Sequence, residues 1–162
     1  MRGSSGAASG IWCGPGRPIL RAMEPQVMPV ELALGERPVT AQLTLNRTED
    51  WNGRGALLTL VCDLGEWTGL GPDIFSALRA LMGDLERVHG RVGLVGARPN
   101  AWASGMQRDM GDGRSVYLLS LPRSPGRPPS APTLDPAPLA DVGTIADQDA
   151  FQRQWMPKPE AP

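Results

Sequence analysis

An alternation of apolar and polar residues predicts two strands near the start of the patterned part of the chain. The segment Pro29–Leu34 has apolar residues at alternate positions, and Val39–Leu45 alternates strictly with threonine and glutamine. A period of two places one face of a strand on a core and the other in water. The intervening Gly35–Pro38 is rich in turn-forming residues, so we expect a hairpin.

A third strand and a long helix follow. The run Ala56–Leu64 is almost entirely apolar, as expected for a central strand. The sequence Gly71-Pro72-Asp73 predicts a helix start, because proline needs no N–H partner there and aspartate favours the positive end of the helix dipole. Apolar residues then recur at helical spacing as far as Val88, and Gly90 is placed to end the helix.

The segments Val92–Val95 and Ser115–Leu121 are the last two predicted strands. The resulting order is β-β-β-α-β-β, with short connections between most elements. This order predicts an α+β fold: a mostly antiparallel five-stranded sheet, one long helix on a face of it, and a short C-terminal helix. We expect the body of this domain to span residues 28–121.

The regions outside this body have a different composition. Residues 122–143 are rich in proline and predict an extended linker, and residues 144–156 predict a helix that docks on the domain. Thr144 and Asp147 resemble a capping box at its start, and Ile145, Phe151 and Trp155 provide an apolar face.

The two ends of the chain lack periodic apolar residues. Residues 1–27 predict a disordered leader and residues 157–162 a disordered tail. Because Met23 begins a segment of different character from the Gly- and Pro-rich residues before it, we interpret Met23 as a candidate natural start.

Composition narrows the classes of function. Residues 1–22 hold three arginines and no acid, so without them 13 basic and 17 acidic residues give a charge of −4, which argues against nucleic-acid binding. The use of 15 arginines against one lysine is typical of a GC-rich, actinobacterial coding bias.

The two cysteines lie in dissimilar contexts and predict no disulfide framework. Neither a membrane span nor a signal peptide is indicated. We therefore expect a cytoplasmic protein.

One segment, residues 97–114, has neither a strand nor a helix period. Segments of this length in compact domains are often functional. It combines arginines with glycines, a serine and a tryptophan, which are the parts of an anion-binding or partner-binding surface. The candidate binding residues are Arg98, Trp102, Ser104, Arg108, Asp109, Arg114 and, in the strand that follows, Tyr117.

A purely structural interpretation of the same segment stays open. In it, Asp109 and Asp112 pair with the arginines of the segment, and Gly111-Asp112-Gly113 forms a turn into the last strand. Four tryptophans in predicted loops or at a terminus admit the same two interpretations, as a binding surface or as anchors for loops: Trp51, Trp67, Trp102 and Trp155.

A resemblance rests on this segment. Its residues Gly96-Ala97-Arg98, Ser104-Gly105-Met106, Arg108-Asp109-Met110-Gly111, Gly113-Arg114 and Val116-Tyr117 resemble a signature of small bacterial, actinobacterial-type proteins with no established activity. A weaker likeness extends over most of residues 28–155. The resemblance implies one coherent fold and transfers no catalytic role, and the proline-rich residues 125–132 depart from it.

The chain offers no catalytic set, cofactor motif or metal-ligand set. His89 is its one histidine and lies at the predicted end of the helix, where it serves the helix dipole. Ser104 lacks the glycine two positions before it that a nucleophile elbow requires, since residue 102 is a tryptophan. No phosphate-binding glycine loop is present. We therefore predict no cofactor, no metal and more readily a binding protein than an enzyme.

Two functions follow from the sequence. The first is a non-enzymatic protein-binding module, such as an immunity or accessory protein, that uses the segment 97–114. The second is a protein or enzyme that binds a small anion, a carboxylate or phosphate, through Arg98 and Arg108 with Asp109 or Tyr117 handling a proton. A concave pocket with converging arginines and an unpaired Asp109 favours the second, and Arg–Asp pairs on a flat surface favour the first.

Overall fold

The computed structural model describes residues 24–156 of the 162-residue chain. The predicted tail and most of the predicted leader, including the candidate start at Met23, lie outside these residues. Within them, no helix is both long enough and apolar enough to cross a membrane.

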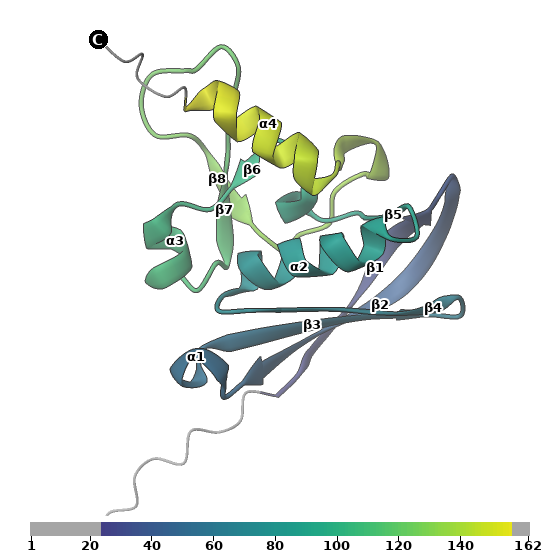
Figure 1. The fold of residues 1–162 in the computed structure, drawn as a ribbon. Helices are drawn as coiled ribbons and strands as arrows, with labels where there is room; N and C mark the ends of the chain where they lie inside the picture. Colours follow the sequence, from purple (N-terminus) through teal and green to yellow (C-terminus); the bar gives the residue numbers. More distant parts are fainter. Residues whose placement is uncertain (1–23, 157–162) are drawn as a thin grey trace, which may run out of the picture.

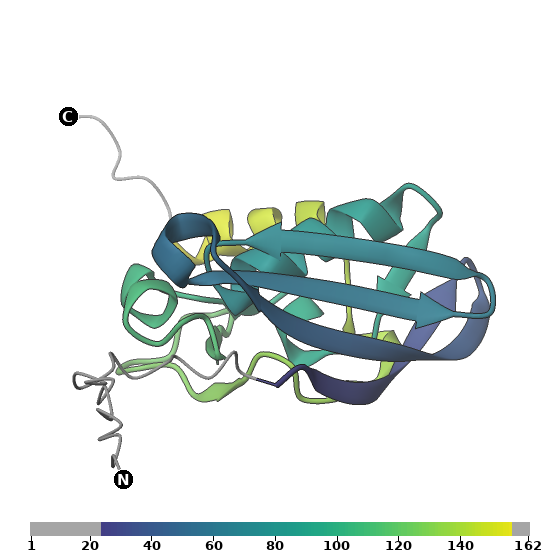
Figure 2. The ribbon, with the colours of Figure 1, turned by 90° about the horizontal axis from the view of Figure 1, so that it is seen from below.

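The main sheet has five strands in the order β4-β3-β2-β1-β5, and every neighbouring pair is antiparallel (Figures 1 and 2). Its strands are β1 (Gln26–Leu34), β2 (Arg37–Thr48), β3 (Gly55–Cys62), β4 (Gly65–Gly71) and β5 (Gly90–Val92). The predicted α+β fold with a five-stranded antiparallel sheet is confirmed. The hairpin between the first two strands turns at Gly35, whose φ angle is +62°.

The membership of this sheet differs from the sequence prediction in one strand. The segment Gly65–Gly71, where Trp67 was predicted to lie in a loop, is β4, whereas the last predicted strand lies outside this sheet. Gly69 and Gly71 allow the helix to lie directly on β4, since a Cβ at Gly71 would come within 2.6 Å of the backbone nitrogen of Ala77. The two glycines weaken the strand pattern in the sequence and permit this close packing.

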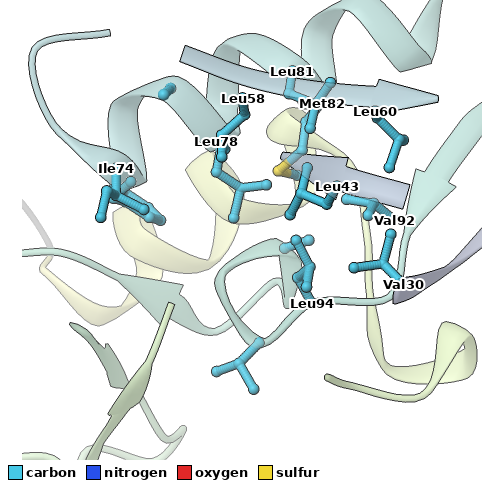
Figure 3. Close-up of a cluster of buried hydrophobic side chains, with 14 of the residues drawn as sticks. Val30, Leu43, Leu58, Leu60, Ile74, Leu78, Leu81, Met82, Val92 and Leu94 are labelled. Carbon is cyan, nitrogen blue, oxygen red and sulfur yellow. The ribbon is translucent and has the colours of Figure 1, made fainter. Parts of the chain in front are cut away.

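One long helix, α2 (Ile74–Glu86), covers one face of the sheet. Asp73 caps its start, because the carboxylate accepts hydrogen bonds from the backbone and the side chain of Ser76. Figure 3 shows apolar side chains of α2 facing those of the sheet in the buried core; the labelled members are Val30, Leu43, Leu58, Leu60, Ile74, Leu78, Leu81, Met82, Val92 and Leu94. The predicted apolar face of the helix is therefore the face that packs.

A second sheet of three antiparallel strands lies beyond the helix, in the order β6-β7-β8. Its strands are β6 (Ala101–Trp102), β7 (Ser115–Leu118) and β8 (Ser130–Pro132). The last strand predicted from the sequence is β7. Its partner β8 comes from the proline-rich residues that we expected to be an extended linker, and the buried Thr133 donates a hydrogen bond from its hydroxyl to the Gly113 carbonyl at 2.6 Å.

The last described element is α4 (Ile145–Trp155), which packs near α2 and β6. Its capping box is formed by Thr144 and Asp147, as the sequence indicates. The side chain of Gln148 is fully buried, and its amide nitrogen donates to the carbonyls of Gly96 and Arg98 at 2.8 and 3.0 Å. Short turns complete the described elements: η1 (Val95–Ala97), η2 (Leu139–Asp141), α1 (Asp50–Gly53) and α3 (Gly105–Asp109).

Candidate functional site

A cleft of about 840 Å³ lies between the turn that joins β2 to β3 and the short helix α3. Figures 1 and 2 place α1, in that turn, and α3 at the same end of the molecule. The surface of the cleft is mainly apolar, but four arginines and four acids line it. The charged residues are Arg47, Arg54, Arg108, Arg114, Glu49, Asp73, Asp109 and Asp112.

The first wall of the cleft is a turn with unusual backbone geometry. Trp51, Asn52 and Gly53 have φ angles of +50°, +61° and +78°, so three successive residues are left-handed. This conformation costs a residue with a Cβ about 1–2 kcal/mol. The turn nonetheless presents Trp51 to solvent with 47% of its surface exposed, which is a feature of binding sites more than of cores.

The second wall is α3, a single short helix whose start is well defined. Ser104 and Gln107 form a capping box, in which each side chain accepts a hydrogen bond from the backbone of the other. The box fixes the direction of the following turn. Met106 on α3 and Met110 directly after it have 70% and 79% of their surfaces exposed.

An ion pair fixes the segment after α3 to the main sheet. The guanidinium of Arg47, on β2, donates two hydrogen bonds to the carboxylate of Asp112, and Arg114 lies 3.7 Å from the same group. The carbonyl of Asp112 also accepts a hydrogen bond from the first residue of α2 at 3.0 Å. A two-point Arg–carboxylate contact is directional, so it orients the wall of the cleft.

A second ion pair spans the mouth of the cleft. Arg54, beside the left-handed turn, donates to Asp109 of α3 at 3.1 Å. Both side chains are mostly exposed, at 63% and 76%, and exposed pairs of this kind contribute about 0–1 kcal/mol. Little free energy is therefore needed to separate the two groups.

Arg108 differs from the other three arginines of the cleft. Its guanidinium lies 5.0 Å from the ring centre of Phe75 and 5.1 Å from that of Trp102, and these two rings meet edge to face. Arg79 approaches the same Trp102 ring at 5.5 Å but forms an ion pair with Asp149 on α4. Among residues 24–156, Arg108 has no carboxylate within 4.0 Å, and its buried Nε has no hydrogen-bond partner.

The surroundings of Arg108 disfavour its charge. Burial lowers the pKa of Arg108 from its ordinary value, the positive charge of Arg79 lowers it further, and the negative charge of Asp73 opposes both effects. Arginine stays protonated in proteins at neutral pH in spite of such effects. Arg108 is thus a partly desolvated cation without an anionic partner in the described chain.

The residues predicted from the sequence lie in different places. Arg108, Asp109 and Arg114 line the cleft, while Trp102 lies behind it and supports Arg108. Ser104 has a structural role as the cap of α3. Like Trp102 and Ser104, two further candidates do not line the cleft: Arg98, whose carbonyl contacts α4, and Tyr117, which pairs with Trp102 in the second sheet.

The structural interpretation of the segment holds only in part. Asp112 does approach Arg114, but its closer partner is Arg47, and Asp109 pairs with Arg54 rather than with an arginine of its own segment. Arg47 and Arg54 were not among the predicted site residues. Nothing in their local sequence distinguishes them, because the pairs connect residues 65 and 55 positions apart.

No protein-family model and no curated protein matches this sequence. The resemblance to small bacterial proteins therefore stays a prediction.

Proposed function

We propose that this protein is a non-enzymatic, cytoplasmic binding protein that docks a partner protein in the cleft between the Trp51 turn and α3. The observation that carries the proposal is the exposed Trp51 on a left-handed backbone, directly beside a concave, mainly apolar surface. An immunity or other accessory protein is the concrete form of this function.

The rim of the cleft favours a macromolecular partner. Trp51 and Met110, which line the cleft, are exposed by 47% and 79%, and Met106 of the adjoining α3 is exposed by 70%. Tryptophan is enriched at the energetic centres of protein interfaces, and methionine adapts its shape to a partner. Burial of such side chains stabilises a complex by about 1.5–3 kcal/mol each.

Three of the four acids that line the cleft already make structural contacts, which supports binding over catalysis, and the fourth, Glu49, is exposed at the rim. Asp73 uses both carboxylate oxygens to cap α2, Asp112 pairs with Arg47, and Asp109 pairs with Arg54. A general base needs a carboxylate that is available to accept a proton from the substrate. These three carboxylates instead hold the walls of the cleft.

Site-specific photo-crosslinking in the native host tests the proposal. A benzophenone amino acid at position 110 should give discrete adducts with another protein, whereas the same group at position 64 should not. Leu64 is a matched control, because it is also exposed, at 49%, but lies in the turn at the other end of β3.

The variant Trp51→Gly provides the second arm of this experiment. Glycine adopts a left-handed backbone without strain, so the change should remove the indole at little cost in stability. We expect the adduct from position 110 to fall by about tenfold or more, as for loss of an interface tryptophan. Equal adducts from positions 64 and 110, or adducts unaffected by Trp51→Gly, would contradict the proposal.

A small anionic ligand is the second candidate function. The volume of the cleft, about 840 Å³, lies within the range of small-molecule sites, and Arg108, one of the two arginines predicted to hold the anion, lines it, whereas Arg98 does not. Asp109, however, is paired with Arg54. Thermal-shift screening with small carboxylates and phosphates tests this candidate, and a saturable rise in Tm that Arg108→Gln abolishes would support it over a partner protein.

A further inference from the structure

We propose that Arg108 is the anion-binding residue of the cleft, and that it binds the carboxylate of an acidic side chain on the partner protein. This assignment rests on the proposed function and adds the chemistry of the group that is recognised.

The guanidinium of Arg108 is held in place before any partner binds. Phe75, which is fully buried, meets Trp102 edge to face, and the guanidinium packs against this corner at 5.0 and 5.1 Å from the two ring centres. The capping box at the start of α3 fixes the helix that carries Arg108. An arginine whose stem and plane are already ordered loses little side-chain entropy when it forms a two-point contact.

The same guanidinium has hydrogen-bonding capacity to spare. Among residues 24–156, its buried Nε has no hydrogen-bond partner and no carboxylate lies within 4.0 Å of the group. Burial of a cation without a partner is unfavourable, and a carboxylate that accepts two parallel N–H bonds relieves this cost. The nearby Arg79, which approaches the same Trp102 ring, already has a carboxylate partner in Asp149.

Four arginines and four acids line the cleft, so it has no excess positive charge that would favour a ligand with two negative charges, and the unpaired cation is the local one of Arg108. The other three arginines of the lining lie against Asp112 or Asp109, which leaves Arg108 as the one cation without an acid within 4.0 Å among the described lining residues. Asp73 acts on Arg108 electrostatically, and the exposed Glu49 adds another negative charge at the rim. Asp73 and Glu49 would repel a phosphate dianion more strongly than a ligand with one charge, and one carboxylate matches the charge of one guanidinium.

The apolar rim identifies the neighbourhood of that carboxylate in the partner. Trp51 and Met110 line the same cleft as Arg108 and remain exposed by 47% and 79%. If the partner has an aspartate or glutamate beside a large apolar residue, the carboxylate would bind Arg108 while the apolar residue covers Trp51 and Met110. The carboxylate would select the partner, and the apolar residue would contribute buried area.

Side-chain NMR of the full chain tests the anion site with defined probes. The probes are N-acetyl-glutamate-N-methylamide, the matching glutamine compound and inorganic phosphate, at constant ionic strength. The signal is the Nε–Hε resonance of Arg108, identified by its loss in Arg108→Lys. We expect the glutamate compound to shift this resonance with saturation, the glutamine compound not to shift it, and phosphate to bind at least about tenfold more weakly than the glutamate compound.

Two variants separate the role of Arg108 from a general effect of charge. In Arg108→Lys, binding of the glutamate compound should weaken by about tenfold, because lysine cannot make the two-point contact of a guanidinium. The Trp102 indole N–H resonance reports this binding, and Tm checks that the variant is folded. Arg91→Gln removes an exposed arginine of β5 outside the cleft and should leave binding unchanged. Equal responses to glutamate and glutamine, or tighter binding of phosphate, would overturn the assignment.

The crosslinking experiment distinguishes failure of this inference from failure of the proposed function. If Arg108→Gln leaves the partner adduct from position 110 intact, the cleft binds the partner but Arg108 is not the anchor. If position 110 yields no adduct while the glutamate compound still binds, Arg108 is an anion site for a free small molecule, and the partner protein is excluded as the source of the carboxylate. Loss of the adduct in Arg108→Gln and its retention in Arg91→Gln is the expected result.

Discussion

Gly113 connects the wall of the cleft to the start of the long helix. Its φ angle is +66°, its backbone N–H donates to the carbonyl of Gln107 at 2.8 Å, and its carbonyl accepts from the buried hydroxyl of Thr133. A Cβ at this position would collide with the carboxylate of Asp73 and come within 2.6 Å of the backbone nitrogen of Phe75. The backbone therefore approaches the N-terminus of α2 more closely than any residue with a side chain could.

We expect Gly113→Ala to lower the free energy of unfolding by about 2–4 kcal/mol, from left-handed strain and from the collision with Asp73. Gly126→Ala is the matched control, because Gly126 is also left-handed, at +85°, but has no neighbour within 4 Å of its Cβ position. That variant should lose only about 1 kcal/mol. Urea denaturation measures both values, and equal losses would show that the collision is relieved without cost.

Asp147 gives the stability of α4 a dependence on pH. The backbone N–H of Thr144, and then its side chain, lower the pKa of Asp147 below its ordinary value of 3.8 in the folded protein. The carboxylate therefore stabilises the fold fully above pH 3.8, and this contribution is lost as pH falls from 3.8 through the lower folded pKa. Because the group is exposed to solvent, the contribution amounts to about 0.5 kcal/mol.

The variant Asp147→Ala tests this sign. Its urea midpoint should lie below that of the wild-type protein between pH 5 and pH 7, on the order of the loss expected for a cap. The two midpoints should converge as the pH falls below 3.8. A difference that persists unchanged at the lowest pH would mean that the carboxylate charge plays no part.

The residue-level predictions from the sequence succeeded where the signal is local. The cap at Thr144 and Asp147 connects residues three positions apart, so the sequence alone displays it. The partners of Asp109 and Asp112 lie in another hairpin, and the edge-to-face pair around Arg108 brings Phe75 to Trp102. Such contacts depend on the tertiary fold, which no local pattern encodes.

At the scale of elements, α4 depends on one buried polar side chain. Gln148 is fully buried and donates two hydrogen bonds to carbonyls of the segment that contains η1. The same segment also receives a hydrogen bond from outside α4, since the N–H of Gly143 donates to the carbonyl of Ala97 at 3.0 Å. The helix is thus attached by specific polar contacts in addition to its apolar residues.

We expect Gln148→Ala to cost about 2–4 kcal/mol, because it leaves two carbonyls without their donor and creates a cavity. Gln154→Ala, on an exposed position of the same helix, should change stability by less than about 0.5 kcal/mol. Hydrogen exchange of the α4 amides should accelerate in the first variant only. Similar exchange in the two variants would show that apolar packing alone holds the helix.

The elements that the sequence predicted well carry strong periods. The strict alternation of β2 and the helical spacing of α2 each extend over many residues, so both elements could be predicted. β4 was not predicted as a strand because three of its seven residues are glycines. α3 and β6 are too short to produce a period, and their residues appeared in the sequence as one long irregular segment.

For the whole molecule, the proline-rich residues decide how much of the chain folds as one unit. The sequence predicts a body of residues 28–121 with an extended linker behind it. In the structure, β8 pairs with β7, the buried Ala137 donates its N–H to the carbonyl of Gly93, and Val142 is buried with the core. Proline removes backbone donors and conceals a strand from pattern analysis, so this contribution could not be predicted.

A truncated chain that ends at Leu121 tests whether the body is independent. Removal of residues 122–162 uncovers Leu94 and Val116, which are fully buried. It also takes away β8, one of the two partners of β7, and Thr133, which donates to the Gly113 carbonyl. Exposure of each such side chain costs about 1.5–3 kcal/mol, against a typical total stability of about 5–15 kcal/mol.

We therefore expect the truncated chain to lose its cooperative urea transition and the dispersion of its amide NMR signals. Trp155→Ala in the full chain is the control: this half-buried residue lies at the end of α4 and stacks on Arg123 at 4.0 Å, so its loss should leave the transition cooperative. A truncated chain whose stability lies within about 1 kcal/mol of the full chain would instead establish residues 28–121 as a self-sufficient domain. Every residue that lines the cleft precedes residue 121, so the fragment would then retain the cleft. The glutamate compound should therefore still shift the Nε–Hε resonance of Arg108.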